Sequence, residues 1–177
     1  MQGAPAIFLD RDGIINRAIV RDGKPHPPGK LDEMELLPWT IHSFPRFRVA
    51  GYMLIGITNQ PDVARGKQSR EEVEAMNAWI QQRLPLQEIF TCYHDDRDGC
   101  DCRKPKPGLI LRAANKHGLN LSQSWMIGDR WKDIAAGQAA GVKTIFVDYH
   151  YSEPYHSNPA DYVVENTEQI NDIILRG

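Results

Sequence analysis

Short apolar runs that each end in a chemically capable residue constrain the fold of this chain more than any other feature. The runs are AIFL (6–9) before Asp10, YMLIGI (52–57) before Thr58, WMIG (125–128) before Asp129 and TIFV (144–147) before Asp148. Continuous apolar runs of this length, rich in Ile and Val, are typical of strands buried on both faces, although a buried helix can carry the same pattern. They are candidates for the strands of a buried sheet.

Patterns typical of helices lie between these runs. Ser69 precedes two glutamates and an apolar series that continues to Leu84, which predicts a helix start at Ser69. Pro107 and Gly118 are the expected opening and closing residues of another helix. Further helices are expected over residues 133–140, 167–175 and 38–51, where Pro45 predicts a break or a late start, and a last strand is expected over 162–164.

Strands that alternate with helices favour a single α/β domain over residues 1–177, with a Rossmann-like, mainly parallel sheet and helices on both faces. In such sheets, ligands bind beyond the carboxyl ends of the strands. Asp10, Thr58 and Asp129 each follow such an end, so we expect their side chains to meet there. Residues 20–37, rich in Pro, Gly and charge, form the longest expected loop.

Composition limits the classes of partner. The net charge of −2 and the lack of a long basic run argue against a nucleic-acid partner. No apolar stretch approaches the roughly 20 residues that a membrane helix needs, and the start MQGAPAIFLDRDG lacks the features of a signal peptide. We therefore expect a cytoplasmic protein without a membrane partner.

The motif LDRDG places two carboxylates directly after the first strand. Asp10 and Asp12 can point to one side, and Gly13 lets the chain turn sharply. Such close carboxylates repel unless a cation lies between them or one holds a proton. The pair suits a magnesium site beside a carboxylate nucleophile, and the alternative interpretation is a turn with solvated charges.

A second acidic motif, GDRWKD, follows a later strand. Gly128 leaves room, Asp129 supplies another carboxylate, and Asp133 lies about one helical turn further on. Taken singly, Asp129 could be a helix N-cap, Thr58 a strand end and Lys104 a surface charge.

All three cysteines of the chain lie in one short stretch. Cys92, His94, Cys100 and Cys102 form the pattern C-x-H-x5-C-x-C, which offers a complete tetrahedral ligand set for structural zinc. Four protein ligands leave no open position for catalysis, so this zinc would hold a loop in place. Reduced cysteines with an unrelated histidine are the alternative.

Taken together, LDRDG, ITN, RKPKPG and GDRWKD resemble the four motifs of haloacid dehalogenase superfamily phosphatases, from about residue 6 to residue 148. The resemblance implies that Asp10 is the nucleophile and that Asp12 is the general acid and then the base. It implies that Thr58 hydrogen-bonds the phosphoryl oxygens and that Lys104 neutralises charge on the phosphate and the nucleophile.

The same resemblance implies the metal ligands. Magnesium would be held by Asp10, Asp129 and the main-chain carbonyl of Asp12, and Asp133 would support Lys104. Both cofactors, Mg²⁺ and Zn²⁺, are therefore expected.

The zinc loop, with TNQ (58–60), ARG (64–66) and CDCRKPKPG (100–108), resembles the subgroup that contains heptose bisphosphate and histidinol phosphate phosphatases. This implies that Arg103 contacts substrate and that Asn59 and Gln60 line the pocket. Pro61-Asp62 departs from the pair usual in the subgroup, which makes this loop's backbone less free.

The resemblance implies a monomeric, magnesium-dependent phosphatase without a sizeable cap domain that hydrolyses a small sugar phosphate through an aspartyl phosphate. The 7-phosphate of heptose 1,7-bisphosphate is the expected target, and histidinol phosphate is the alternative substrate. A catalytically dead zinc-loop binding module is a remote alternative, because it does not explain Asp10, Asp12, Thr58 and Asp129 together.

Overall fold

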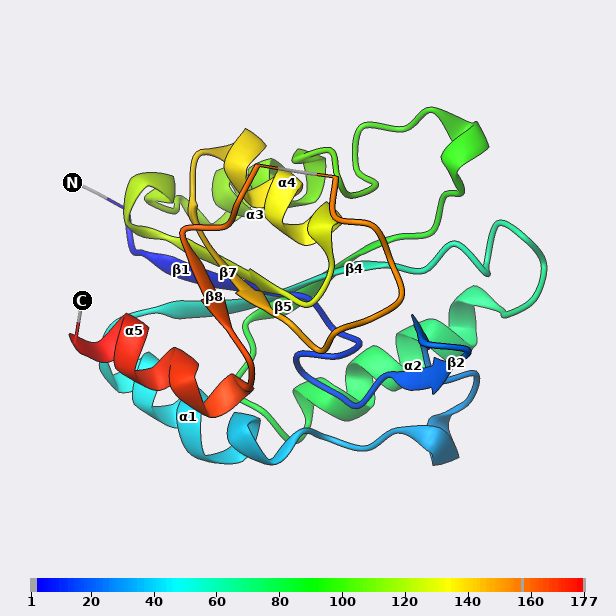
Figure 1. Ribbon diagram of the computed structural model, residues 1–177, viewed down its shortest axis with the longest axis horizontal. Coiled ribbons are helices and arrows are strands. Elements are labelled where there is room, and N and C mark those ends of the chain that lie inside the picture. Colours follow the sequence, from blue (N-terminus) through cyan, green and yellow to red (C-terminus); the bar gives the residue numbers. More distant parts are fainter. Residues whose placement is uncertain (1–2, 157, 177) are drawn as a thin grey trace.

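A six-stranded parallel sheet forms the centre of the computed structural model, which describes residues 3–156 and 158–176 (Figure 1). Its strand order is β5-β4-β1-β6-β7-β8. The strands are β1 (Ala6–Leu9), β4 (Met53–Asn59), β5 (Glu88–Cys92), β6 (Trp125–Gly128), β7 (Lys143–Val147) and β8 (Tyr162–Val164). The expected α/β fold with a mainly parallel sheet is therefore confirmed. Strand β5 was not predicted, because EIFTC is only half-buried and mixes charged and apolar residues.

The central strand β1 separates two hydrophobic cores. Its side chains alternate across the sheet, so that Ile7 and Leu9 pack into one core while Ala6 and Phe8 pack into the other. All four are fully buried. Burial of a large apolar side chain such as Phe8 stabilises the fold by about 1.5–3 kcal/mol. Because both faces of β1 pack against a core, apolar residues are favoured at every position of this strand.

Helices cover both faces of the sheet, as expected (Figure 1). One face carries α1 (Pro38–Val49), α2 (Arg70–Gln81) and α5 (Ile170–Arg176), and the other carries α3 (Gly108–His117) and α4 (Trp131–Ala140). None of the helices in the described ranges has the length and apolar character needed to cross a membrane.

Local signals set most helix ends. The Ser69 hydroxyl accepts from the backbone N–H of Glu72 at 3.1 Å, and the Glu72 carboxylate accepts from the backbone N–H of Ser69 at 2.8 Å. This capping box confirms the predicted start of α2. Gly118, with φ of 61°, ends α3 as expected.

The prediction that Pro45 breaks or delays α1 is wrong, because the helix runs without interruption from Pro38 to Val49. Proline removes one backbone donor and leaves the carbonyl of Ile41, four residues earlier, without that partner. Both Pro45 and Ile41 are exposed, so water can bind this carbonyl. The inward-facing Trp39 and Phe44 hold the helix against the core.

The expected loop over residues 20–37 contains a small antiparallel hairpin of β2 (Ile19–Arg21) and β3 (Lys24–His26). Its turn is Asp22-Gly23, and both residues have positive φ, at 51° and 72°. Asp-Gly between two short strands is a strong hairpin signal, so the hairpin could have been predicted from the sequence.

Candidate active site and metal centres

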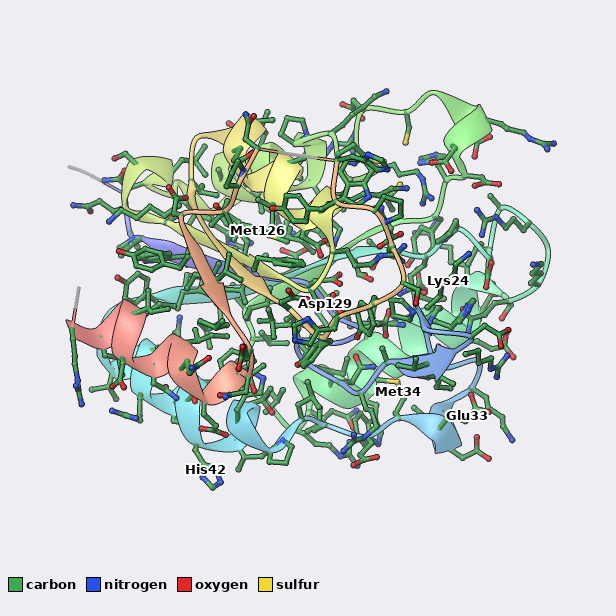
Figure 2. The ribbon with its side chains drawn as sticks, in the orientation of Figure 1. Lys24, Glu33, Met34, His42, Met126 and Asp129 are labelled. Atoms are coloured by element: carbon green, nitrogen blue, oxygen red, sulfur yellow. The ribbon has the colours of Figure 1, made fainter. Side chains whose placement is uncertain are left out.

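Three neighbouring strands bring the acidic motifs together. Strand β1 pairs in parallel with β4 on one side and β6 on the other, with Leu9 opposite Gly56 and Ile127. The residues that follow these strands therefore gather at one edge of the sheet. Figure 2 shows Asp129 at this edge, on the side of the molecule where the hairpin carries Lys24.

Lys104 lies at the centre of this cluster. Its ammonium Nζ donates to Asp10 Oδ1 at 2.7 Å and to the Ile57 carbonyl at 2.8 Å, and it lies 2.6 Å from Asp133 Oδ1. Lys104 is only 3% exposed. Burial by itself lowers the pKa of Lys104, but the charges of Asp10 and Asp133 outweigh this effect and leave the pKa above its ordinary value. Lys104 is therefore a fixed positive charge.

The carboxylates of Asp10, Asp129 and Asp133 have oxygens within 4.8 Å of one another, and all three residues are buried. Two glycines make this approach possible. A Cβ on Gly13 would meet Asp129 Oδ2 at 2.0 Å, and one on Gly128 would meet Asp133 Oδ2 at 2.3 Å. Any other residue at these positions would push the carboxylates apart.

The electrostatics of this acidic cluster favour a cation. Burial, then the charge of Asp133, raises the pKa of Asp10 to about 7. Burial, then the charges of Asp10 and Asp133, raises the pKa of Asp129 well above its ordinary value, while the nearby Tyr151 hydroxyl acts in the opposite sense. Both Asp129 oxygens are buried and accept no hydrogen bond from the described residues. Oxygen ligands of this kind fit a hard divalent cation such as magnesium.

Asp12 lines the same cavity as Asp10 and has hydrogen-bond partners of its own. Its Oδ1 accepts from Asn16 Nδ2 at 3.0 Å and its Oδ2 accepts from Gln60 Nε2 at 2.8 Å. The Arg11 guanidinium donates to both oxygens at 3.1 Å. The Asp12 side chain is 15% exposed, so a reacting group can still reach it.

The last residues of β4, Thr58 and Asn59, and the next residue, Gln60, support the site. The Thr58 side chain is buried, and its Oγ1 accepts from Gln60 Nε2 at 2.9 Å. Gln60 is also fully buried, so its amide faces Asp12 and Thr58 and does not line the cavity as expected. The Asn59 side chain lines the cavity and pairs with the backbone of Lys104, donating at 3.0 Å and accepting at 3.1 Å.

The structure brings Cys92, His94, Cys100 and Cys102 into one cluster. Five of the six separations among their sulfur atoms and His94 Nδ1 run from 3.2 to 3.8 Å, and all the ligand atoms lie within 4.8 Å of one another. A tetrahedral zinc with bonds of about 2.3 Å to sulfur needs ligand separations of about 3.8 Å. Burial, and next the hydrogen bond with Cys102, raises the pKa of the Cys92 thiol. A metal cation is what would favour the thiolate there.

The cysteine cluster is joined to the acidic cluster by a short stretch of chain. Arg103 follows Cys102 directly, and its guanidinium donates to Asp96 Oδ1 at 2.7 Å and to the His94 carbonyl at 3.4 Å. The next residue is Lys104. A well-ordered cysteine loop therefore also fixes the position of Lys104, whose ammonium group pairs with Asp10.

A cavity of about 370 Å³ opens above these residues. Of the expected site residues, it is lined by Asp10, Asp12, Asn59, Arg103, Lys104 and Asp133. Basic side chains to which the sequence analysis gave no role of their own also line the cavity: Lys24, Arg65, Lys67, Arg130 and Lys132. They come from the β2–β3 hairpin, the loop after β4 and the start of α4, so no local pattern groups all of them, although Arg130 and Lys132 both lie inside GDRWKD. The lining has seven Lys and Arg side chains against five Asp side chains, and Lys24, Arg65 and Lys67 are exposed, which makes the cavity suitable for a phosphorylated ligand.

Comparisons with known proteins agree with this geometry. A family model described as HAD-hydrolase-like matches residues 101–170. The chain is 32% identical to the D-glycero-beta-D-manno-heptose-1,7-bisphosphate 7-phosphatase of Escherichia coli, over 99% of this chain and 96% of that protein. The enzyme of the same name from Helicobacter pylori is 38% identical over 78% of this chain and 80% of its own length.

A solved structure is similar over nearly the whole fold. The D,D-heptose 1,7-bisphosphate phosphatase from B. bronchiseptica, complexed with magnesium and phosphate, superposes with a TM-score of 0.79 and 26% identity, covering 97% of this chain and 98% of that one. The chain therefore belongs to the haloacid dehalogenase-like family of hydrolases, among its phosphoric monoester hydrolases.

Proposed function

We propose that this protein is a magnesium-dependent phosphatase that removes the 7-phosphate of D-glycero-D-manno-heptose 1,7-bisphosphate through a phosphorylated Asp10. The contact that carries the proposal is the buried ion pair of Asp10 with Lys104, at 2.7 Å, on the wall of a cavity rimmed by cations. The relatives named as heptose bisphosphate phosphatases support the choice of substrate.

In the proposed first step, a carboxylate oxygen of Asp10 attacks phosphorus and the bond from phosphorus to the sugar oxygen breaks. Asp12 gives its proton to that leaving oxygen. In the second step, water attacks phosphorus, passes its proton to Asp12, and inorganic phosphate leaves Asp10. Each group faces the same cavity, which lets one acid-base residue serve both steps.

Lys104 and Thr58 would stabilise the charge that develops on the phosphoryl oxygens. Phosphoryl transfer depends mainly on alignment and on positive charge at these oxygens. Lys104 also favours the ionised, nucleophilic form of Asp10, because it offsets part of the burial that raises the pKa of Asp10 to about 7. Asp133 fixes Lys104 from the other side, at 2.6 Å.

The magnesium ligands would be Asp10, Asp129 and the main-chain carbonyl of Asp12. The unpaired, buried oxygens of Asp129, among the described residues, fit this assignment. When bound, magnesium supplies positive charge to the phosphate and to the nucleophile.

The zinc ligands would be Cys92, His94, Cys100 and Cys102, with a structural role. Thiolate and imidazole ligands favour zinc, while carboxylate and carbonyl oxygens favour magnesium. The zinc would order the loop that carries Arg103 toward the substrate. Asn59 would line the substrate cavity beside it, and we assign Gln60 to the support of Asp12 because its amide is buried.

The proposal takes residues 1–177 as one phosphatase domain that acts as a monomer in the cytoplasm, without a sizeable cap, a nucleic-acid partner or a membrane partner. The cavity of about 370 Å³ has room for a sugar phosphate, and its exposed cations, such as Lys24 and Lys67, can face a second phosphate.

The test compares phosphate release from heptose 1,7-bisphosphate and from histidinol phosphate, with and without magnesium. We expect magnesium-dependent release from the bisphosphate, with phosphorus NMR showing that the 1-phosphate remains. Asp10→Asn should be inactive, while Asp148→Asn, the same change after strand β7, should remain active. Faster release from histidinol phosphate would overturn the substrate assignment, and an active Asp10→Asn variant would overturn the nucleophile.

A further inference from the structure

A buried arginine lies between the two aspartates of LDRDG. Arg11 is completely buried, and its guanidinium holds both carboxylate oxygens of Asp12, with Nε at 3.1 Å from Oδ1 and Nη2 at 3.1 Å from Oδ2. Such a two-pronged contact fixes the direction of a carboxylate as well as its distance.

The other side of the guanidinium is anchored to the body of the protein. Arg11 Nη1 donates to Asn77 Oδ1 at 3.1 Å, and Asn77 Nδ2 donates to Thr91 Oγ1 at 3.0 Å. Asn77 belongs to α2 and Thr91 to β5, so two elements of the core hold the arginine. The described residues that line the cavity do not include Arg11, Asn77 or Thr91. This chain of contacts therefore reaches the reaction only through Asp12.

In its ionised form Asp12 has its hydrogen-bonding capacity filled, and the protonated form that acts as the acid gives up one of these four contacts. Each of its oxygens accepts from one nitrogen of Arg11, and Asn16 and Gln60 supply one further donor each. A carboxylate offers about four acceptor positions, so these donors leave it little freedom to rotate. Part of its side chain still faces the cavity.

We propose that Arg11 is a positioning residue for both proton transfers: anchored by Asn77, it aims the Asp12 carboxylate at the oxygen that enters or leaves phosphorus. The inference rests on the proposed phosphatase function. Arg11 is not among the described residues that line the cavity, so it would act only through Asp12. Its loss would let Asp12 rotate, and a misplacement of about 1 Å can cost about a hundredfold in rate.

The dependence of the reaction rate on the leaving group distinguishes a positioning role for Arg11 from general support of the fold. The sugar oxygen leaves as a poor leaving group and needs the proton of Asp12, whereas p-nitrophenolate departs from p-nitrophenyl phosphate without it. The parameter to compare is kcat/KM, because it covers the first phosphoryl transfer and not the later attack of water. General acid catalysis contributes about a hundredfold to ten-thousandfold, which sets the size of the effect on the sugar substrate.

The main variant is Arg11→Lys, which keeps the charge but loses the two-pronged contact. We expect its kcat/KM to fall about a hundredfold for the sugar bisphosphate and to change little for p-nitrophenyl phosphate. Asn77→Leu, which removes the anchor at similar size, should show the same selectivity to a smaller degree, and it replaces Arg11→Lys if that variant does not fold. Arg17→Lys, at an exposed ion pair with Glu35, is the matched control and should change neither value.

A double variant completes the test. Because Arg11 is proposed to act through Asp12, adding Arg11→Lys to Asp12→Asn should cost no further activity. Equal losses for both esters, or additive losses in the double variant, would overturn the positioning role and leave the phosphatase proposal standing. A wild-type protein that hydrolyses neither ester would instead overturn the proposed function, and the positioning role with it.

Discussion

Replacing Lys104 with methionine gives the sharpest test of the electrostatics of the site. Methionine is similar in length to the apolar stem of lysine but lacks the positively charged ammonium group. Asp10 and Asp133, at 2.7 and 2.6 Å from Nζ, lose their shared buried cation. Removing one partner of a buried ion pair typically costs about 3–5 kcal/mol, because the other charge is left uncompensated.

The expected effect on thermal unfolding follows from the size of the protein. For a chain of 177 residues, each kcal/mol corresponds to about 2–4 °C, so the midpoint should fall by about 6–20 °C in magnesium-free buffer near pH 8. Burial, then the charge of Asp133, already raises the pKa of Asp10 to about 7. The carboxylates of the variant can take up protons at lower pH, so the loss should shrink near pH 5.5.

The assay is calorimetry of both proteins at the two pH values, with phosphate release measured in parallel. Lys116→Met is the matched control, because Lys116 forms an exposed ion pair with Glu88, and such pairs contribute about 0–1 kcal/mol. The reasoning fails if Lys104→Met loses no more stability than Lys116→Met. It also fails if the loss does not depend on pH.

The remaining predictions concern the nucleophile and the two metals. Asp10→Asn should fold normally, as judged by circular dichroism, yet incorporate no phosphate from substrate, because an amide cannot attack phosphorus; phosphate on the purified variant would contradict the assignment. Elemental analysis should find one zinc per chain in the wild-type protein, and Cys100→Ser should lose it and lower kcat/KM about a hundredfold by releasing Arg103 and Lys104; full activity without zinc would show that the loop does not position the site. The folded state raises the pKa of Asp10, so protonation of Asp10 stabilises the folded protein. This contribution to the free energy of unfolding is fully present below the pKa of Asp10 in the unfolded chain, and it is lost as pH rises through about 7. Magnesium competes with that proton, so it should raise the unfolding midpoint more near pH 8 than near pH 5.5, and Asp129→Ala should abolish the difference.

Several parts of the site could be predicted without coordinates because their signals are local. A strand buried on both faces must be continuously apolar, so the runs before Asp10, Thr58 and Asp129 were visible in the sequence. The clustering of Cys92, His94, Cys100 and Cys102 was also visible, because ligands of one metal that lie close in the chain have a characteristic spacing.

Other parts depended on elements that are far apart in the chain. The cavity cations Lys24, Arg65 and Lys132 come from a hairpin, a loop and the start of α4, and each alone looks like an ordinary surface residue. Gln60 was expected to face the cavity, but the path of the chain after β4 turns its amide inward to Asp12. Single-residue patterns do not encode these directions, since they follow from how the loops pack.

The amino-acid sequence by itself determined four of the central strands and the helices between them, the acidic residues that follow the strands and the clustering of the cysteines with His94, because burial and ligand spacing act on nearby residues. Only the tertiary structure decided that Arg11, which reads as one more charge in LDRDG, lies buried against Asp12 and Asn77. Arg11 and Asn77 are 66 positions apart in the chain, so the place of Arg11 depends on the intervening chain folding so that α2 meets the end of β1. Long-range packing determines such contacts, and here it places the buried guanidinium of Arg11 against Asp12 and Asn77.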